Sequence, residues 1–84
     1  MNERQLLAEA GRRALAHLDG SAQRRVYPDD QAIAALSTFD QPWPESGQDA
    51  QRVLQQLDEL GSPATVTSNG PRYFGFVIGA TLPA

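Results

Sequence analysis

The final fifteen residues, Gly70 to Ala84, constrain most strongly what this chain can fold into. They carry a single charge, on Arg72, and place three aromatic residues within four positions. Their apolar residues follow neither strand nor helix periodicity, so both sides of the segment require burial. An isolated small domain would expose such a segment as an apolar patch. We therefore expect the chain to be an N-terminal part of a larger protein that buries residues 70–84.

The composition excludes several classes of protein and site. The chain has 84 residues, enough for one small domain, and no cysteine that could stabilise it through a disulfide. With His17 as its one histidine, it cannot build a four-ligand zinc site. All seven basic residues are arginines, so chemistry that requires a lysine amine cannot run on this chain alone.

Charge and hydropathy also bear on partners and location. The net charge is −3 and the basic residues are scattered, whereas nucleic-acid binding requires a basic face. We therefore expect no nucleic-acid partner. No apolar run is long enough for a signal-peptide core or a membrane span, which predicts no membrane contact and a cytoplasmic location.

The expected fold class is mainly α, with three helices followed by an extended segment. The first helix is predicted at about residues 3–18, capped by Asn2 with Gln5 as its capping-box partner and stopped by Gly20. Glu9 and Arg13 should pair on its polar side. Its narrow apolar stripe suits a helix laid on a partner surface, and consists of Leu6, Leu7, Ala10, Ala14 and Leu18.

Two further helices are predicted at about residues 30–39 and 47–60. Asp29 or Asp30 should cap the second helix, and Ser46 the third, with Asp49 as its partner. The indole of Trp43, held between two prolines, is expected to pack on a neighbouring helix. These helices define a helical segment over residues 1–61, and residues 62–84 form an extended segment.

No conventional active site can be assembled from these residues. The chain lacks a nucleophile turn with a partnering base, a metal-ligand cluster and a phosphate-binding glycine loop. The adjacent acids of residues 29–30 and 58–59 are interpreted as a helix cap and a helix end. We therefore predict no catalytic and no metal-binding residue in this chain.

The sequence Pro71-Arg72-Tyr73-Phe74-Gly75-Phe76-Val77, followed by Gly79-Ala80-Thr81-Leu82-Pro83-Ala84, resembles the N-terminal signature of the pyridoxal-phosphate-dependent group II amino-acid decarboxylases. That family includes the aromatic-L-amino-acid, glutamate and 2,4-diaminobutyrate decarboxylases. The upstream layout of helices and linker is similar as well, so the resemblance covers nearly the whole chain.

The resemblance implies that the chain is the N-terminal part of an α/β fold-type I enzyme that works as a homodimer. It implies that the N-terminal helices pack across the other subunit. The same resemblance places four residues in the substrate pocket: Phe76 and Val77 as apolar walls, Gly79 and Ala80 through backbone contacts. Gly79 stands where some relatives carry a polar side chain, so a hydroxyl contact with the substrate would be lost.

The family's cofactor-binding lysine, the acid that pairs with the pyridine nitrogen and the histidine that stacks on the ring all lie downstream of this segment. The chain is therefore expected to bind no pyridoxal phosphate alone and to be inactive by itself. The parent enzyme would remove the α-carboxylate of an amino acid. One alternative is a small helical interaction module that docks an apolar C-terminal strand into a partner. Another is a different fold-type I lyase or aminotransferase as the parent.

Overall fold

The computed structural model describes residues 1–75, and within them the chain is mainly helical, with three α-helices and no β-strand. Helix α1 spans Glu3–Gly20, α2 spans Asp30–Ala35 and α3 spans Ala50–Gln56. Short helical turns extend two of them, at Leu36–Phe39 after α2 and at Leu57–Gly61 after α3. A further 3₁₀ turn, Ser62–Ala64, follows at once.

The helices begin where the side-chain chemistry favours a cap. Asn2 accepts from the Gln5 amide while the Gln5 side chain accepts from the Asn2 amide, each at 2.9 Å, so the predicted capping box of α1 is confirmed. Asp29 caps α2 by accepting from the Ala32 amide at 2.8 Å. Helix α1 continues through Gly20, which was predicted to stop it, and its C-cap is Ser21.

The predicted start of the third helix is wrong by three residues. Asp49, not Ser46, is the N-cap of α3, and it accepts from the Arg52 amide at 3.3 Å. A start at Ser46 would place Gly47 in the first turn, where glycine costs about 1 kcal/mol relative to alanine. A carboxylate at the N-cap also interacts favourably with the helix dipole, which a serine does not offer.

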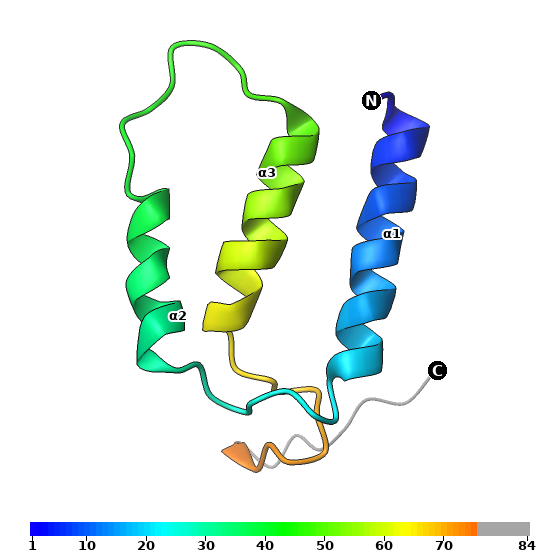
Figure 1. Cartoon of the computed structure of the whole chain (residues 1–84), viewed down its shortest axis with the longest axis vertical. Helices are drawn as coiled ribbons and strands as arrows, with labels where there is room; N and C mark the ends of the chain where they lie inside the picture. The colour runs from blue at the N-terminus through cyan, green and yellow to red at the C-terminus, as the bar shows by residue number, and fades with distance from the viewer. Residues whose placement is uncertain (76–84) are drawn as a thin grey trace.

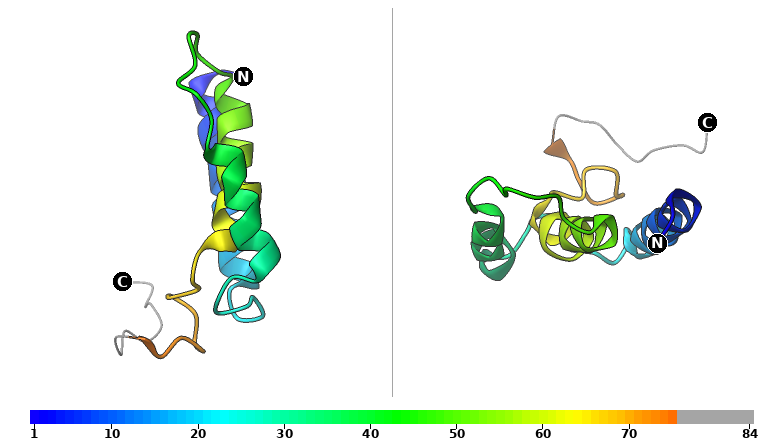
Figure 2. Two further views of the ribbon diagram at one scale, coloured as in Figure 1. Left: turned by 90° about the vertical axis from the view of Figure 1, so that its left-hand side faces the viewer. Right: turned by 90° about the horizontal axis from the view of Figure 1, so that it is seen from above.

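The three helices lie side by side in one layer (Figures 1 and 2). Helix α3 occupies the middle; α1 beside it runs in the same direction, and α2 on the other side runs in the opposite direction (Figure 1). The molecule measures 43 × 31 × 19 Å along its principal axes, and residues 65–75 leave the plane of the helices below their ends (Figure 2).

The interior is very small for a chain of this size. Within residues 1–75, Tyr73 is the one buried hydrophobic residue and Thr67 is the buried polar side chain, and neither lies on a helix. Counted over all 84 residues, the chain exposes 6840 Å². A compact monomer of 9.1 kDa is expected to expose about 4,900 Å². The helices thus form a layer with no core of their own.

Candidate functional site

The four residues predicted to line a substrate pocket, Phe76, Val77, Gly79 and Ala80, lie outside the described residues. What the structure describes is the segment that leads to them, residues 62–75, and the layer from which that segment departs.

Thr67 ties the end of the chain to the linker after α1. Its amide donates to the carbonyl of Val26 at 2.8 Å, and its hydroxyl donates to the carbonyl of Arg25 at 2.7 Å. Thr67 is buried, with 2% of its surface exposed. A turn then reverses the chain, with the Gly70 amide donating to the Thr67 carbonyl at 3.2 Å.

Two arginines reinforce this junction. Arg24 extends its guanidinium to His17 at the end of α1 and to the carbonyl of Ser62, and it also donates to the Thr65 hydroxyl at 3.2 Å. Arg72 in turn donates to the backbone carbonyl of Arg24. Residues 24–26 are therefore held against residues 62–72 by hydrogen bonds from both sides. We refer to these contacts together as the junction.

An aromatic pair completes the junction. The rings of Tyr27 and Tyr73 meet edge to face, with centroids 6.3 Å apart. Tyr73 is 9% exposed, whereas Tyr27 is 60% exposed. Gly75 then passes so close to the Tyr73 ring that a Cβ at this position would lie 2.9 Å from Cε2. Glycine at position 75 lets the backbone cross Tyr73 immediately before the predicted pocket residues.

The helical layer has one apolar and one polar side. On α1, the residues that are partly covered by α3 are Leu6, Ala10, Arg13 and His17. At 100° per residue, Leu7 and Leu18 lie about a quarter-turn from that contact, on one side of the layer. Their side chains are 72% and 58% exposed.

The apolar residues of α3 and α2 fall on the same side. Asp58, in the turn that continues α3, accepts from Arg13 of α1, and Leu54 lies one helical turn before it on the same side. Val53 and Leu57 are about a quarter-turn from that contact, in the direction that puts them on the same side of the layer as Leu7 and Leu18. Leu36, in the 3₁₀ turn that continues the antiparallel α2, is a further exposed apolar residue. We call the resulting surface the apolar face, and it comprises Leu7, Leu18, Leu36, Val53 and Leu57.

The apolar stripe predicted for α1 is therefore only partly an intrachain contact. Leu6 and Ala10 turn toward α3, but Leu7, Ala14 and Leu18 are exposed. The position nearest Asp58 of α3 is taken by Arg13 instead. Part of the predicted stripe therefore packs on α3, and the rest is exposed. The periodicity of the sequence alone does not distinguish these two parts.

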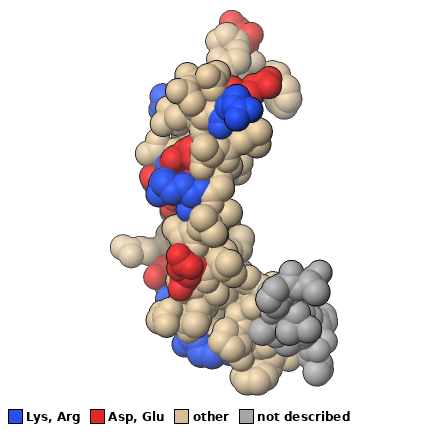
Figure 3. Space-filling model, turned by 90° about the vertical axis from the view of Figure 1, so that its right-hand side faces the viewer, with Lys and Arg blue, Asp and Glu red and all other residues tan. Residues whose placement is uncertain are grey.

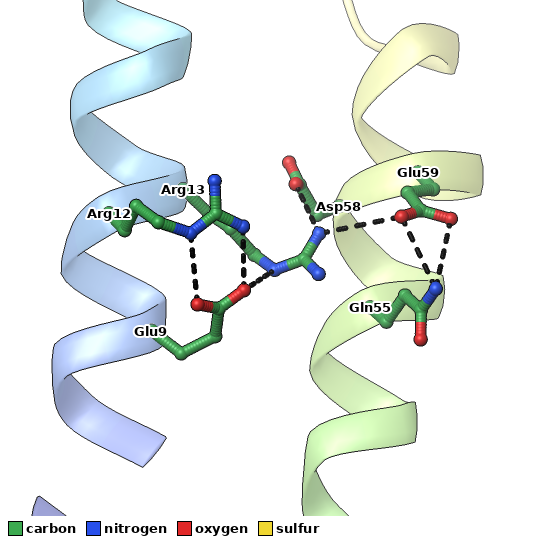
Figure 4. A network of polar contacts seen from close by, with 6 residues as sticks. All are labelled: Glu9, Arg12, Arg13, Gln55, Asp58 and Glu59. Atoms are coloured by element: carbon green, nitrogen blue, oxygen red, sulfur yellow. Dashed lines mark hydrogen bonds and ion pairs between the residues drawn. The ribbon is translucent and has the colours of Figure 1, made fainter. Parts of the chain in front are cut away.

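The opposite side of the layer carries a polar network (Figure 4). Arg13 crosses from α1 to α3 and donates to Asp58 at 2.8 Å, with Glu59 at 3.7 Å. Glu9 accepts from Arg13 at 3.0 Å, which confirms the predicted pair, and from Arg12 at 2.9 Å. The Arg13 side chain is 15% exposed, so this bridge is better shielded from water than an ordinary surface pair.

The network shifts the acid–base behaviour of its members. The hydrogen bond from Arg12 is the main cause that lowers the pKa of the Glu9 carboxyl to about 2 from its ordinary 4.5. The charge of Arg13 acts in the same direction, while partial desolvation opposes it. The bond to Asp58 is the main cause that raises the pKa of Arg13. Both groups thus stay charged at neutral pH.

A shallow groove of about 300 Å³ opens between α3 and the loop before it. Its walls include Phe39, Trp43, Val53 and Leu57. The expectation that Trp43 packs on a neighbouring helix is wrong, because 94% of its surface is exposed. The prolines on either side hold residues 42–44 away from the helices, so the indole is presented to solvent.

Residues 1–75 contain no cluster of three or more histidine or acidic side chains that could hold a metal ion. Among the helices described, none has the length and apolarity needed to cross a bilayer. Viewed from the α1 side, the surface intersperses basic with acidic groups (Figure 3).

Comparison with protein-family models, with curated proteins and with solved structures finds no match to this chain.

Sequence reasoning missed the residues that organise the described site. These residues are Arg24 and Thr67, and their hydrogen bonds reach far along the chain. Arg24 donates to Thr65, 41 positions away, and Thr67 donates to Arg25, 42 positions away. The sequence does contain an indication of the apolar face. Leu7, Leu15 and Leu18 widen the apolar surface of α1 beyond the area that one neighbouring helix can cover, so part of it must remain exposed.

Proposed function

We propose that this chain is the N-terminal segment of a pyridoxal-phosphate-dependent amino-acid decarboxylase of the group II, fold-type I class. In that role its helical layer packs against the other subunit of a homodimer in the cytoplasm. Residues 70–84 then form part of the wall of the substrate pocket, with Phe76 and Val77 as apolar contacts and Gly79 and Ala80 as backbone contacts.

The observation that carries this proposal is the sequence Pro71 to Val77 with its Gly79-to-Ala84 continuation, because the order of residues there resembles one family's signature. Two physical features support it. The apolar face leaves large side chains exposed on all three helices, as expected of a layer that a second surface covers. The junction also holds Tyr73 and Gly75 in place directly before the pocket residues.

The cofactor does not fit the residues of this chain taken alone. Pyridoxal phosphate is held covalently by a lysine amine, and none of the 84 residues is a lysine. The chain can supply walls and packing surface, while cofactor binding and the removal of carbon dioxide would belong to the remainder of the parent enzyme.

The first test is the sequence that follows Ala84 in the reading frame. The proposal expects a continuing frame that reaches a downstream His-Lys pair. A protein expressed from that frame should bind pyridoxal phosphate and release carbon dioxide from an amino acid. A frame that ends at Ala84 would overturn the assignment to a working decarboxylase.

The second test uses the 84-residue chain itself. Incubated with pyridoxal phosphate and passed through a desalting column, it should retain no cofactor absorbance. Blocking the N-terminal amine by acetylation provides the matched control, because that amine is the one primary amine present. Retained absorbance that survives acetylation would contradict the proposal that the chain lacks a cofactor site.

A second candidate function is a small helical interaction module, favoured by the exposed apolar face and by Trp43 at 94% exposure. In this reading the layer and the C-terminal apolar residues dock into a partner protein without any enzyme chemistry. A reading frame without a downstream His-Lys pair, combined with saturable capture of one partner that substitution of Trp43 or Leu57 weakens, would favour it over the decarboxylase.

A further inference from the structure

The described residues that line the groove beside α3 are all uncharged, although 20% of the chain is charged. Phe39, Val53 and Leu57 supply apolar surface within it. At about 300 Å³, the groove lies at the lower end of the size range of ligand pockets, so it suits one large side chain. Three lining residues carry side-chain amides that can form hydrogen bonds: Gln41, Gln48 and Gln56.

The indole of Trp43 lines this groove without filling it, because 94% of its surface is exposed. Pro42 and Pro44 restrict the backbone on either side, so little conformational entropy is lost when the ring docks on another surface. Tryptophan is among the residue types that most often anchor protein interfaces, since it buries a large apolar area and donates one hydrogen bond. The chain thus presents an anchor and a groove of matching chemistry side by side.

We propose that the groove receives Trp43 of a second copy of this chain, so that each copy of a dimer anchors the other. A two-fold axis makes the exchange reciprocal, because both copies present the same surface. The indole of one copy then packs on Phe39, Val53 and Leu57 of the other, and its N–H donates to a glutamine amide oxygen of the groove. Val53 and Leu57 also belong to the apolar face, so the groove and that face are continuous.

Charge and area favour a second copy as the occupant. A two-fold interface brings each group close to its own counterpart, so a charged lining would repel itself, whereas this lining is neutral. The chain exposes 6840 Å², while a compact monomer of its mass would expose about 4,900 Å². An interface of standard size covers about 800 Å² on each partner, and the difference is large enough to supply it.

The exchange of Trp43 does not depend on the proposed function, because it requires the groove and the indole alone. Either a decarboxylase or an interaction module could contain it. The measurements that test it involve neither cofactor nor activity, so their failure would leave the proposed function standing.

Trp43 is the one tryptophan of the chain, so its fluorescence reports directly on the groove. Sedimentation velocity and selectively excited tryptophan emission are recorded on a dilution series of the 84-residue chain. A dimer should form as the concentration rises, and the emission should shift to shorter wavelength with the same midpoint. An indole that stays water-exposed in the dimer would overturn the proposal, as would association that passes to large aggregates without a dimer.

Substitutions separate this groove from the rest of the surface. Trp43→Ala should raise the dissociation constant of the dimer roughly 30-fold or more, the effect of removing an interface hot spot. Gln56→Glu places two like charges in the exchanged contact and should raise the constant roughly tenfold or more. Gln51→Glu is the matched control, because it adds the same charge on the opposite side of α3 and outside the groove. An unchanged constant for Trp43→Ala, or equal constants for the two glutamate variants, would refute the exchange.

The salt dependence distinguishes a second copy from a basic partner surface. The charged residues next to the groove are mainly acidic, with Asp40, Glu45 and Asp49 against Arg52, and each copy has a net charge of −3. Two copies therefore repel each other, and added salt should screen this repulsion and lower the dissociation constant of the dimer. A dimer that dissociates on addition of salt would mean that the acidic loop meets basic groups, and would contradict the exchange.

Discussion

Arg13 shows how one side chain decides the relation between two helices. It stands in an alanine-rich helix at a position where a leucine would pack, and it joins Glu9 of its own helix to Asp58 of α3. Because the contact is made by charge rather than by apolar area, its strength depends on geometry, shielding and pH. Two predictions follow at the level of single residues.

The first concerns the bridge itself. A double-mutant cycle with Arg13→Ala and Asp58→Ala should give a small but favourable coupling free energy, as measured for ion pairs near the surface. Urea unfolding followed by circular dichroism measures it. Arg4→Ala, an exposed arginine on the same helix, is the matched control and should leave the midpoint unchanged. A coupling energy of zero would show that the bridge adds nothing to docking.

The second concerns Glu9. Its pKa in the folded chain is lowered to about 2 from 4.5, so the folded state holds its carboxylate more strongly than the unfolded state does. The stabilisation is complete above about pH 4.5 and is lost as the pH falls toward 2. A ¹³C titration of the Glu9 carboxyl should show the low midpoint, and Arg12→Ala should raise it more than Arg4→Ala does.

At the scale of elements, local chemistry decided what could be predicted. The three helices and the caps at Asn2 and Asp29 follow from short-range rules and agree with the structure. The start of α3 could not be predicted in the same way, because Ser46 and Asp49 are both favoured N-cap residues. Only Gly47, which lies between them, disfavours a helix that begins at Ser46. The junction could not be predicted, since its hydrogen bonds join residues far apart in the sequence.

The cap of α3 provides a direct test of that correction. Asp49→Ala should lower the free energy of unfolding by about 1 kcal/mol, the usual cost of removing an N-cap side chain. Ser46→Ala should leave it unchanged within error, because residue 46 lies outside the helix. Urea unfolding of both variants measures the difference, and an equal loss in the two would place the cap at Ser46 after all.

At the scale of the whole molecule, the layer is stable only to the extent that something covers its apolar face. The predicted pocket residues stay a prediction, because they lie beyond residue 75. What the structure adds is the surface from which a larger assembly would be built: three helices in one plane (Figure 2), with exposed leucines and a polar network.

This arrangement predicts self-association of the isolated chain through the apolar face. Leu7→Glu combined with Leu18→Glu should reduce the sedimentation coefficient toward that of a monomer, and helix content should fall with it because the layer loses the surface that covers it. Gln5→Glu combined with Ala16→Glu adds the same two charges to α1 away from the apolar face, and should have a smaller effect. Equal effects from the two pairs would mean that added charge, rather than loss of the face, disperses the chain.

The parallel course of α1 and α3 has a consequence for how the chain is made. Arg13 and Asp58 are 45 positions apart, so α1 leaves the ribosome long before its neighbour exists. At about 5–20 residues per second, that interval lasts roughly 2–9 s. Most of the stability of a helix in a protein comes from the packing of its apolar face, which α1 lacks during this time. Its leucines are then available to whatever nascent or chaperoning surface they meet first.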